Sequence, residues 1–206
     1  MFTETLSGKT KEALALLGKS HLLDKAYLAG GSGLALQLGH RISIDLDFFT
    51  PEEFEPKEVA RRLQRLANFK LEGRSLGTIW GRLEGIRFSL FLYKYLVLFS
   101  FKKIYGINVS DLRDIAAMKI EAIASRGIRR DFIDLYFICQ GGISLKKILS
   151  FYDRKFGKLA SNIIHIQKSL VYFVDAESEK MPKTLKPVTW EEIKRYFEQE
   201  VRKMIK

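Results

Sequence analysis

The chain has very little cysteine and histidine, which excludes several common kinds of site. Cys139 is the only cysteine among 206 residues, so an internal disulfide and a metal centre built from several cysteines are both excluded. A reducing, cytoplasmic location is the default expectation. The three histidines, His21, His40 and His165, are not spaced as metal ligands. They also form no Ser-His-Asp or Cys-His arrangement that would suit nucleophilic catalysis.

Long apolar runs are missing as well. The best candidate, FSLFLYKYLVLFSF from Phe88, is shorter than the roughly 18 apolar residues of a membrane span, and Lys94 interrupts it. The segment MFTETLSGKT lacks a basic start followed by an apolar core, so we expect no signal peptide and no membrane partner. With 47% hydrophobic residues the chain can bury a core. Its length fits one domain, or one domain with a helical appendage.

The positive charge is unevenly distributed along the chain. The net charge is +11, but residues 1–60 hold six Lys/Arg against nine Asp/Glu, whereas residues 61–206 hold 29 against 15. An acidic segment within a basic protein suits a polyanionic substrate such as a nucleotide or RNA. The alternative is that the excess charge serves only solubility.

Hydrophobic spacing and turn residues predict a mixed α/β (α+β) half followed by an all-helical half. We expect helices over residues 5–20, 32–38 and 56–66, and strands over 26–30, 42–49 and much of 69–101. Beyond these, the spacing predicts helices over 110–126, 129–140, 145–156, 158–174 and 189–205. The predicted domains are residues 1–108 and residues 109–206.

The segment GGSGLALQLGHRISIDLDFF, residues 30–49, contains two aspartates with one residue between them. On a strand, Asp45 and Asp47 project from one face while Leu46 faces the other way. Neighbouring carboxylates repel each other unless a positive group lies between them. Mg²⁺ is usually held by one or two carboxylates together with substrate phosphates. The pattern predicts one or two Mg²⁺ ions here; the alternative is a strand end exposed to water.

A glycine-rich turn, Gly30-Gly31-Ser32, lies upstream of this pair. Glycines let backbone N–H groups approach a phosphate, and the N-terminus of the following helix favours an anion. Such a turn is weak evidence alone. Placed before the Asp-x-Asp pattern, it becomes much stronger evidence for phosphate binding beside a metal ion.

Residues 114–138 carry a second group of polar side chains. Lys119 lies in mid-helix among small apolar residues and shares a stripe with Arg126. It can contact triphosphate oxygens as a point charge, or it extends to the surface. Asp131 and Asp134 lie near the start of the next helix, where the dipole favours acids. The arginines beside them can pair with phosphate or with these acids; they are Arg129 and Arg130.

A basic run follows in residues 141–170, with aromatic residues interleaved. It is either an RNA-facing surface or a solvated helix face over an apolar core. Its members are Lys146, Lys147, Arg154, Lys155, Lys158 and Lys168, with Phe151, Tyr152 and Phe156 between them.

These motifs together resemble the nucleotidyltransferase toxins of the AbiEii type, within the DNA polymerase β-like nucleotidyltransferase superfamily. The GGS turn with Asp-x-Asp resembles the family's first motif, KIEAIASR (119–126) its second, and RRD (129–131) its third. Asp134 with Tyr136 resembles the fourth, and MPKTLKPVTWEEIKRYF resembles the family's usual ending. The resemblance covers most of the chain, from about residue 27 to residue 197.

The resemblance implies a polymerase β-like mixed sheet flanked by helices, followed by a C-terminal helical bundle. It also implies transfer of NMP from an NTP, in some members onto the 3′ end of tRNA, and a toxin that pairs with an antitoxin. We therefore predict Mg²⁺ on Asp45 and Asp47, within residues 1–108. Residues 109–206 are expected to complete the nucleotide site and to face the acceptor. The other predicted site residues are Gly30, Gly31, Ser32, Lys119 and Arg126 for the nucleotide, Asp45, Asp47, Lys119 and Asp131 for catalysis, and Arg129, Arg130 and Asp134 for the acceptor or a phosphate.

One departure from the superfamily pattern leaves an alternative open. Many polymerase β-like enzymes place a third carboxylate on a following strand, and here Ser89 stands at that place. Glu84 is the nearest acid, but it precedes Gly85. Either Asp131 supplies the missing function, or the chain is a weak or inactive module that binds RNA or a protein partner. A small-molecule acceptor such as an aminoglycoside would favour an acidic second half, and this one is basic.

Overall fold

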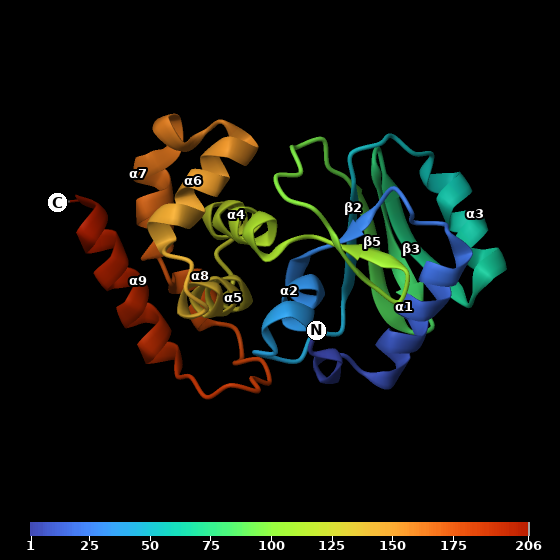
Figure 1. Cartoon of the computed structure of the whole chain (residues 1–206), viewed down its shortest axis with the longest axis horizontal. Helices are drawn as coiled ribbons and strands as arrows, with labels where there is room; N and C mark the ends of the chain where they lie inside the picture. The colour runs from blue at the N-terminus through green and yellow to red at the C-terminus, as the bar shows by residue number, and fades with distance from the viewer. Residues whose placement is uncertain (206) are drawn as a thin grey trace.

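A mixed β-sheet with two helices on its outer face lies beside a bundle of helices in the computed structural model, which describes residues 1–205 (Figure 1). The strand order within these residues is β3-β4-β5-β2-β1-β7-β6. The strands are β1 (Tyr27–Leu28), β2 (Leu46–Thr50), β3 (Phe69–Ser75), β4 (Thr78–Leu83), β5 (Ile86–Leu92), β6 (Lys102–Ile104) and β7 (Ile107–Val109).

The central strands run in both directions, as the predicted mixed sheet requires. Strands β3, β4 and β5 form an antiparallel meander, and β2 pairs with β5 in parallel. Strand β1 pairs antiparallel with β2 and parallel with β7. The parallel pairing of β2 with β5 places the segment that contains Asp45 and Asp47 next to a strand of the meander, so side chains of β5 lie beside the aspartates.

One face of the sheet is buried beneath α1 (Gly8–Ser20) and α3 (Pro56–Leu66) (Figure 1). Alternate strand residues such as Phe48 and Phe88 point into this core and pack with Leu14 and Leu63 from the two helices. Pro56 occupies the first turn of α3, where its missing N–H is not needed. The opposite, open face of the sheet looks toward the helical half.

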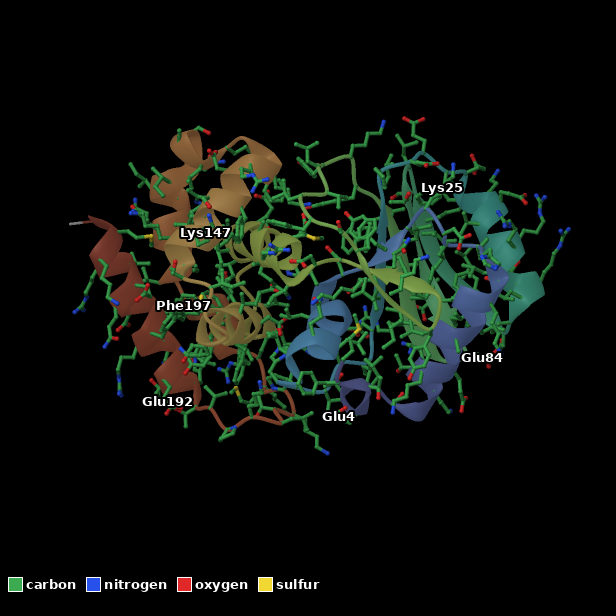
Figure 2. All side chains as sticks on the ribbon, viewed as in Figure 1. Glu4, Lys25, Glu84, Lys147, Glu192 and Phe197 are labelled. Carbon is green, nitrogen blue, oxygen red and sulfur yellow. The ribbon has the colours of Figure 1, made fainter. Side chains whose placement is uncertain are left out.

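The helical half consists of α4 (Leu112–Ser125), α5 (Arg129–Gln140), α6 (Leu145–Phe156), α7 (Leu159–Leu170), α8 (Val174–Glu177) and α9 (Trp190–Ile205). Its core includes Ile115, Phe132 and Phe197. The Phe197 side chain lies on the side of α9 that faces α5 (Figure 2), with its ring centroid 5.6 Å from that of Phe132. Among residues 1–205, no helix has both the length and the apolar character of a membrane span.

Helix α2 (Gly30–Leu38) lies between the two halves and contacts both. Leu34 belongs to the core of the helical half, whereas Leu36 belongs to the core beneath the sheet. Gly39 ends the helix in the left-handed conformation, with φ 62°. The glycine-rich start of α2 is thereby fixed at the junction between sheet and helices.

Most predicted helices are confirmed within a few residues, but two strand predictions need correction. The strand expected over residues 42–49 begins only at Leu46, because the Ile42 and Ser43 N–H groups donate to carbonyls of Lys183 and Thr5. Residues 93–101 form no strand, although the sequence predicted one. The backbone N–H groups of Leu98 and Phe99 donate to Asp114 instead.

The end of the sheet also differs from the prediction. Strands β6 and β7 form an antiparallel hairpin that the sequence did not predict. The domain boundary predicted after residue 108 falls inside β7, one residue before that strand ends and shortly before α4 begins. The division of the chain into two domains stays a prediction.

Candidate active site

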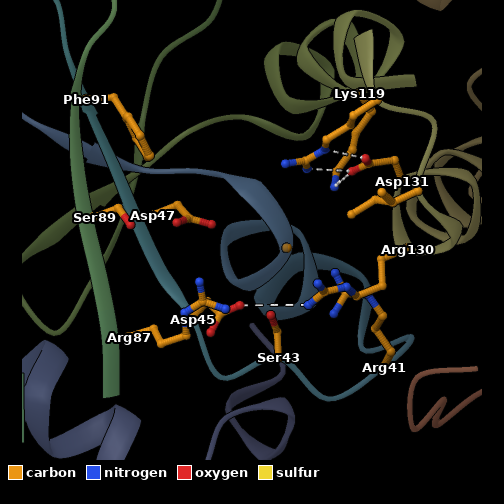
Figure 3. A pocket seen from close by; sticks show the side chains of 13 residues that line it. Arg41, Ser43, Asp45, Asp47, Arg87, Ser89, Phe91, Lys119, Arg130 and Asp131 are labelled. Atoms are coloured by element: carbon orange, nitrogen blue, oxygen red, sulfur yellow. Dashed lines mark hydrogen bonds and ion pairs between the residues drawn. The ribbon is translucent and has the colours of Figure 1, made fainter. Parts of the chain in front are cut away.

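The two aspartates lie at the start of β2 on the open face of the sheet. Leu46 and Phe48 alternate with them and are fully buried on the other face. Asp45 and Asp47 both point into the space between the sheet and the helices (Figure 3). The strand pattern therefore has the consequence that the sequence predicted, namely two carboxylates on one side of the chain.

Burial raises the pKa of the Asp47 carboxyl, and the neighbouring Asp45 charge raises it further. Lys119, Arg126 and Arg87 act in the opposite direction without reversing the shift. A carboxylate that is costly to ionise beside a second carboxylate is stabilised by a cation bound between the two. The oxygen donors fit Mg²⁺, which prefers such ligands. Within residues 1–205, however, no group of three or more His, Cys, Asp or Glu is gathered as a metal site.

Strand β5 supplies the neighbours of the aspartate pair. In the parallel register Asp47 lies opposite Ser89, so the serine stands where a third carboxylate was expected. Arg87, two residues earlier on the same face, also lines the cleft (Figure 3). Strand β5 therefore places a hydroxyl, from Ser89, and a positive charge, from Arg87, beside the aspartates. It contributes no third carboxylate at these two positions.

The glycine-rich turn forms the floor of the cleft at the start of α2. Gly30 has φ 59° and begins the helix, separated from β1 by Ala29 alone. A Cβ atom on Gly30 would lie 3.1 Å from Oδ2 of Asp47, and a Cβ atom on Gly31 would collide with the Arg41 guanidinium. The absence of side chains therefore keeps the helix N-terminus, an anion-favouring position, open beside the aspartates.

Ser32 is placed differently from its predicted role as a contact of the nucleotide. Its side chain is buried, its hydroxyl donates to the backbone carbonyl of Asp45, and its oxygen lies 3.0 Å from that of the Ser43 hydroxyl. In this conformation Ser32 holds the segment that carries Asp45 and does not line the cleft. That Ser32 contacts the nucleotide stays a prediction.

Opposite the aspartates, Lys119 and Arg126 of the helical half form a cationic wall. Asp131 binds both: Lys119 Nζ lies 2.7 Å from its Oδ1, and Arg126 donates to its two oxygens over 3.1 Å and 2.9 Å. Burial opposes ionisation of Asp131, but these two cations outweigh it and lower the pKa of its carboxyl. The pKa of the Lys119 ammonium is raised in turn, because its acidic neighbours overcome its burial.

Asp134 lies behind this wall and not on it. Its carboxylate is fully buried and binds Arg41 at 2.7 Å and 2.9 Å, Lys119 at 2.7 Å and His40 at 2.8 Å. Although burial opposes ionisation, these partners hold the pKa of Asp134 well below its usual range. In this conformation the Asp134 carboxylate has no exposed surface, and its contact with the acceptor or a phosphate stays a prediction. Asp134 instead binds Arg41 and Lys119, two cations that line the cleft, on their buried side.

The two arginines before Asp131 separate in space. Arg130 lines the cleft, and its Nη1 lies 3.8 Å from Oδ2 of Asp45 (Figure 3). Arg129 points away from it, donates to the carbonyls of Ala176 and Glu177 and lies over the Trp190 ring. Of this pair, the structure places only Arg130 where it can meet a phosphate.

The basic run of residues 141–170 is also divided by the fold. Lys155 is buried and pairs with Asp114 at 2.8 Å, and it donates to the carbonyl of Leu96. Phe151 and Tyr152 belong to the core of the helical half. These aromatic side chains therefore offer no stacking surface for RNA, which corrects that interpretation of the run and favours the solvated helix face.

The cleft consists of two adjoining cavities, and the residues that line both are Gly31, Asp47, Phe91, Lys119 and Arg126. One is strongly charged and has a volume of about 260 Å³; the cations that line it are Arg41, Arg87, Lys119, Arg126 and Arg130, against Asp45, Asp47 and Asp131. The other has a volume of about 440 Å³ and a more apolar lining that includes Phe49, Phe91, Tyr93 and Met118, with Glu121 among them. Asp47 lies at the boundary between them, whereas Asp45 lines only the charged cavity.

Sequence reasoning missed two arginines of this cleft, Arg41 and Arg87. Arg41 lies within residues 30–49 but had no predicted role, and Arg87 lies on a strand dominated by apolar residues. The alternation of β5 could have revealed Arg87, because it shares a face with Ser89. Nothing in the local sequence signals that Arg41 is buried against Asp134.

The mixed sheet, the acidic pair at the start of a strand and the glycine-rich helix start define a nucleotidyltransferase fold. Two solved structures share it over nearly the whole chain. JHP933 of Helicobacter pylori is 14% identical, with a TM-score of 0.58, covering 97% of this chain and 93% of its own. MenT4, a nucleotidyltransferase toxin of Mycobacterium tuberculosis, is 15% identical, with a TM-score of 0.55, covering 95% and 84%.

The family is established by sequence. The family model for the AbiEii nucleotidyl transferase toxin of type IV toxin–antitoxin systems matches residues 12–90 and 91–204. The chain belongs to this family and is a nucleotidyltransferase. The uncharacterized protein aq_aa25 of Aquifex aeolicus is 36% identical over 205 residues. The match covers 97% of this chain and 98% of that protein. The resemblance inferred from the motifs is thereby confirmed.

Proposed function

We propose that this nucleotidyltransferase transfers NMP from a Mg²⁺-bound NTP to a hydroxyl of RNA, such as the 3′ end of tRNA. The observation that supports this best is the position of Asp45 and Asp47, which face a wall of cations across a cleft at a helix N-terminus. Acids that bind a metal, facing cations that bind phosphate, suit phosphoryl chemistry, where catalysis is mostly positioning and charge stabilisation.

The two cavities suggest how the nucleotide is oriented. The charged cavity suits the triphosphate, with Arg130 and Arg87 near the aspartates and Lys119 and Arg126 opposite. The apolar cavity suits the nucleoside, because Phe91 and Tyr93 provide aromatic surface beside Asp47. Asp45 and Asp47 would hold the Mg²⁺, which when bound neutralises phosphate charge and polarises the α-phosphate.

In the reaction, an acceptor hydroxyl oxygen forms a bond to the α-phosphorus. The bond from that phosphorus to the bridging oxygen breaks, pyrophosphate leaves, and the hydroxyl proton passes to water. Asp131 is poorly suited to take that proton, because its pKa is lowered and both of its oxygens are occupied. We assign it instead to holding Lys119 and Arg126, which stabilise the leaving pyrophosphate.

The acceptor and the partner are inferred from charge and family. A net charge of +11 favours a polyanionic acceptor such as RNA, and membership of a type IV toxin–antitoxin family supports a cognate antitoxin and a toxic outcome. A single cysteine is in keeping with a cytoplasmic location.

A second candidate function is supported by one observation. Ser89, and not a third carboxylate, faces Asp47, so an inactive nucleotidyltransferase fold that binds RNA or a protein partner is the competing hypothesis.

Labelled transfer separates the two hypotheses. The protein is incubated with each of the four α-labelled NTPs, Mg²⁺ and total tRNA, alongside Asp45→Ala, Asp47→Ala and the surface control Asp175→Ala. We expect Mg²⁺-dependent label on RNA from the wild type and the control only. Label that persists in folded Asp47→Ala would refute the role of the pair. Absence of label with all four NTPs would favour the binding module.

A further inference from the structure

The open face of the sheet continues beyond the aspartates across β5, β4 and β3, since α1 and α3 pack on the opposite face (Figure 1). In the strand registers, Asp47 of β2 lies opposite Ser89 of β5, Ser89 lies opposite Trp80 of β4, and Trp80 lies opposite Gly73 of β3. We call these four residues the Trp80 row. Neighbouring strands are about 4.8 Å apart, so Trp80 stands about 10 Å from the catalytic aspartate on the same face.

Trp80 presents an aromatic surface in this row. Its side chain is 40% exposed, although the residues on either side of it, Ile79 and Gly81, are buried on the opposite face. Its ring lies over Gly73, where a Cβ atom would collide with the six-membered ring. The glycine therefore leaves room for the six-membered ring close to the backbone of β3, while a large part of the residue stays exposed to solvent.

A second row of side chains runs beside the Trp80 row and is entirely cationic. Arg87 lies opposite Arg82, and Arg82 lies opposite Lys70; we call these three residues the cation row. Arg82 also binds Glu72 at 2.8 Å, where β3 bulges, so one of the three charges is partly neutralised. Arg87 also lines the charged cavity beside the aspartates. The cation row thus begins in the active site and leads out of it.

An aromatic platform beside a line of cations is the arrangement that binds single-stranded nucleic acid. Bases stack on the aromatic face regardless of sequence, and the cations follow the phosphates. An isolated exposed tryptophan would need no such explanation. This one is aligned with a catalytic residue by strand register, and its row leaves the aspartates on the side where Ser89 replaces the expected acid.

We propose that the open face of β5, β4 and β3 is the path of the acceptor strand, with a base near its 3′ end stacked on Trp80 and its phosphates along the cation row. The partner is single-stranded RNA, because a lone ring face recognises an unstacked base, which a duplex does not offer. The acceptor thus crosses the sheet and not the basic run of residues 141–170. The inference rests on the proposed function in one respect, namely that the acceptor is RNA.

Intrinsic fluorescence tests the stacking directly. Trp190, the other tryptophan, is replaced in a Trp190→Phe protein, so emission reports Trp80 alone. A ten-nucleotide single-stranded RNA is titrated without NTP or Mg²⁺, with a blunt RNA hairpin as comparison. We expect the single strand to quench the emission more strongly than the hairpin. RNA binding with no change in Trp80 emission would overturn the proposal.

Affinity is measured in variants of the full-length chain that retain Trp190, with a labelled copy of the same RNA. Trp80→Ala should weaken binding about 5- to 150-fold, the equivalent of about 1–3 kcal/mol for one stacked base, and Trp80→Phe should recover most of it. Gly73→Ala displaces the ring without removing it and should also weaken binding. Lys70→Ala should reduce the magnitude of the slope of log affinity against log salt concentration by about 0.7. Leu76→Ala, at a fully exposed position of the same hairpin, is the matched control.

The outcomes distinguish this inference from the proposed function. Unchanged affinity in folded Trp80→Ala and Gly73→Ala, while the wild type binds and labels RNA, overturns the path and leaves the transfer intact. Weakened binding in both variants without transfer from any NTP supports the path and rejects the enzyme. A wild type that binds no single-stranded RNA overturns both the path and the RNA acceptor.

Discussion

Replacing Asp134 with asparagine should destabilise the protein more than any change at its surface. The carboxylate is fully buried and accepts from Arg41 over 2.7 Å and 2.9 Å, from Lys119 at 2.7 Å and from His40 at 2.8 Å. The asparagine side chain keeps the shape but has no negative charge. Arg41 is itself buried, so its guanidinium would remain within the protein without a full counter-charge.

The expected magnitude follows from the burial of these charges. Breaking a buried ion pair by removing one partner costs about 3–5 kcal/mol, and each kcal/mol shifts the melting temperature by about 2–4 °C at this chain length. We therefore expect Asp134→Asn to lower it by about 6–20 °C. The exposed pair His21–Asp24 provides the matched control, and Asp24→Asn should cost less than about 1 kcal/mol.

Thermal and urea unfolding at several pH values measure this effect and its sign. Because the folded pKa of Asp134 is lowered, its stabilisation is present at neutral pH and is lost as pH falls through that folded value. The gap between wild type and Asp134→Asn should therefore persist at mildly acidic pH and close only below the usual carboxyl range. An unfolding free energy within about 1 kcal/mol of wild type would refute the buried network. So would a loss of activity without loss of stability, because Asp134 would then act on the substrate.

Three further predictions concern the cleft and its supports. Asp47→Asn should abolish transfer. At pH values above the raised folded pKa of Asp47, it should also raise the melting temperature, because ionisation of the buried carboxyl opposes folding. A melting temperature below that of the wild type at neutral pH would contradict this. Gly30→Ala should cost about 1–2 kcal/mol from its left-handed backbone and impair transfer by crowding Asp47. Gly142 also has positive φ but has open space around it, so Gly142→Ala should lose stability without losing transfer. Equal activities of the two variants in an NTP-transfer assay would reject the crowding of Asp47. Asp114→Asn should lower the free energy of unfolding by about 3–5 kcal/mol, because it breaks the buried pair with Lys155. Urea unfolding measures this, with Glu53→Gln at an exposed position as the control, and an equal loss in both variants would contradict it.

The regular elements and the acidic pair could be predicted because each depends on local pattern. Alternation along β2 predicted the shared face of Asp45 and Asp47, and capping residues such as Asp111, whose side chain accepts from the Arg113 N–H, predicted the start of α4. Residues 93–101 escaped prediction because Asp114 and Lys155, distant in sequence, satisfy their backbone groups. No local periodicity reports such partners.

The roles of individual site residues were harder to predict than their presence. Lys119, Asp131 and Asp134 belong to one buried network, and their geometry depends on how α4 and α5 pack. The sequence therefore indicated charges suited to phosphate chemistry but could not tell which carboxylate faces the cleft and which lies behind it. The place of Trp80 beside Ser89 likewise follows from strand register, which the sequence does not specify.

The central claim is that Asp45 and Asp47 direct nucleotidyl transfer, and product stoichiometry tests it most directly. Pyrophosphate release and label incorporation into RNA are measured in one reaction with an α-labelled NTP. We predict one pyrophosphate for each NMP incorporated, and loss of both products together in Asp45→Asn and Asp47→Asn. Release of inorganic phosphate in place of pyrophosphate, or unchanged incorporation in either folded variant, would contradict the account.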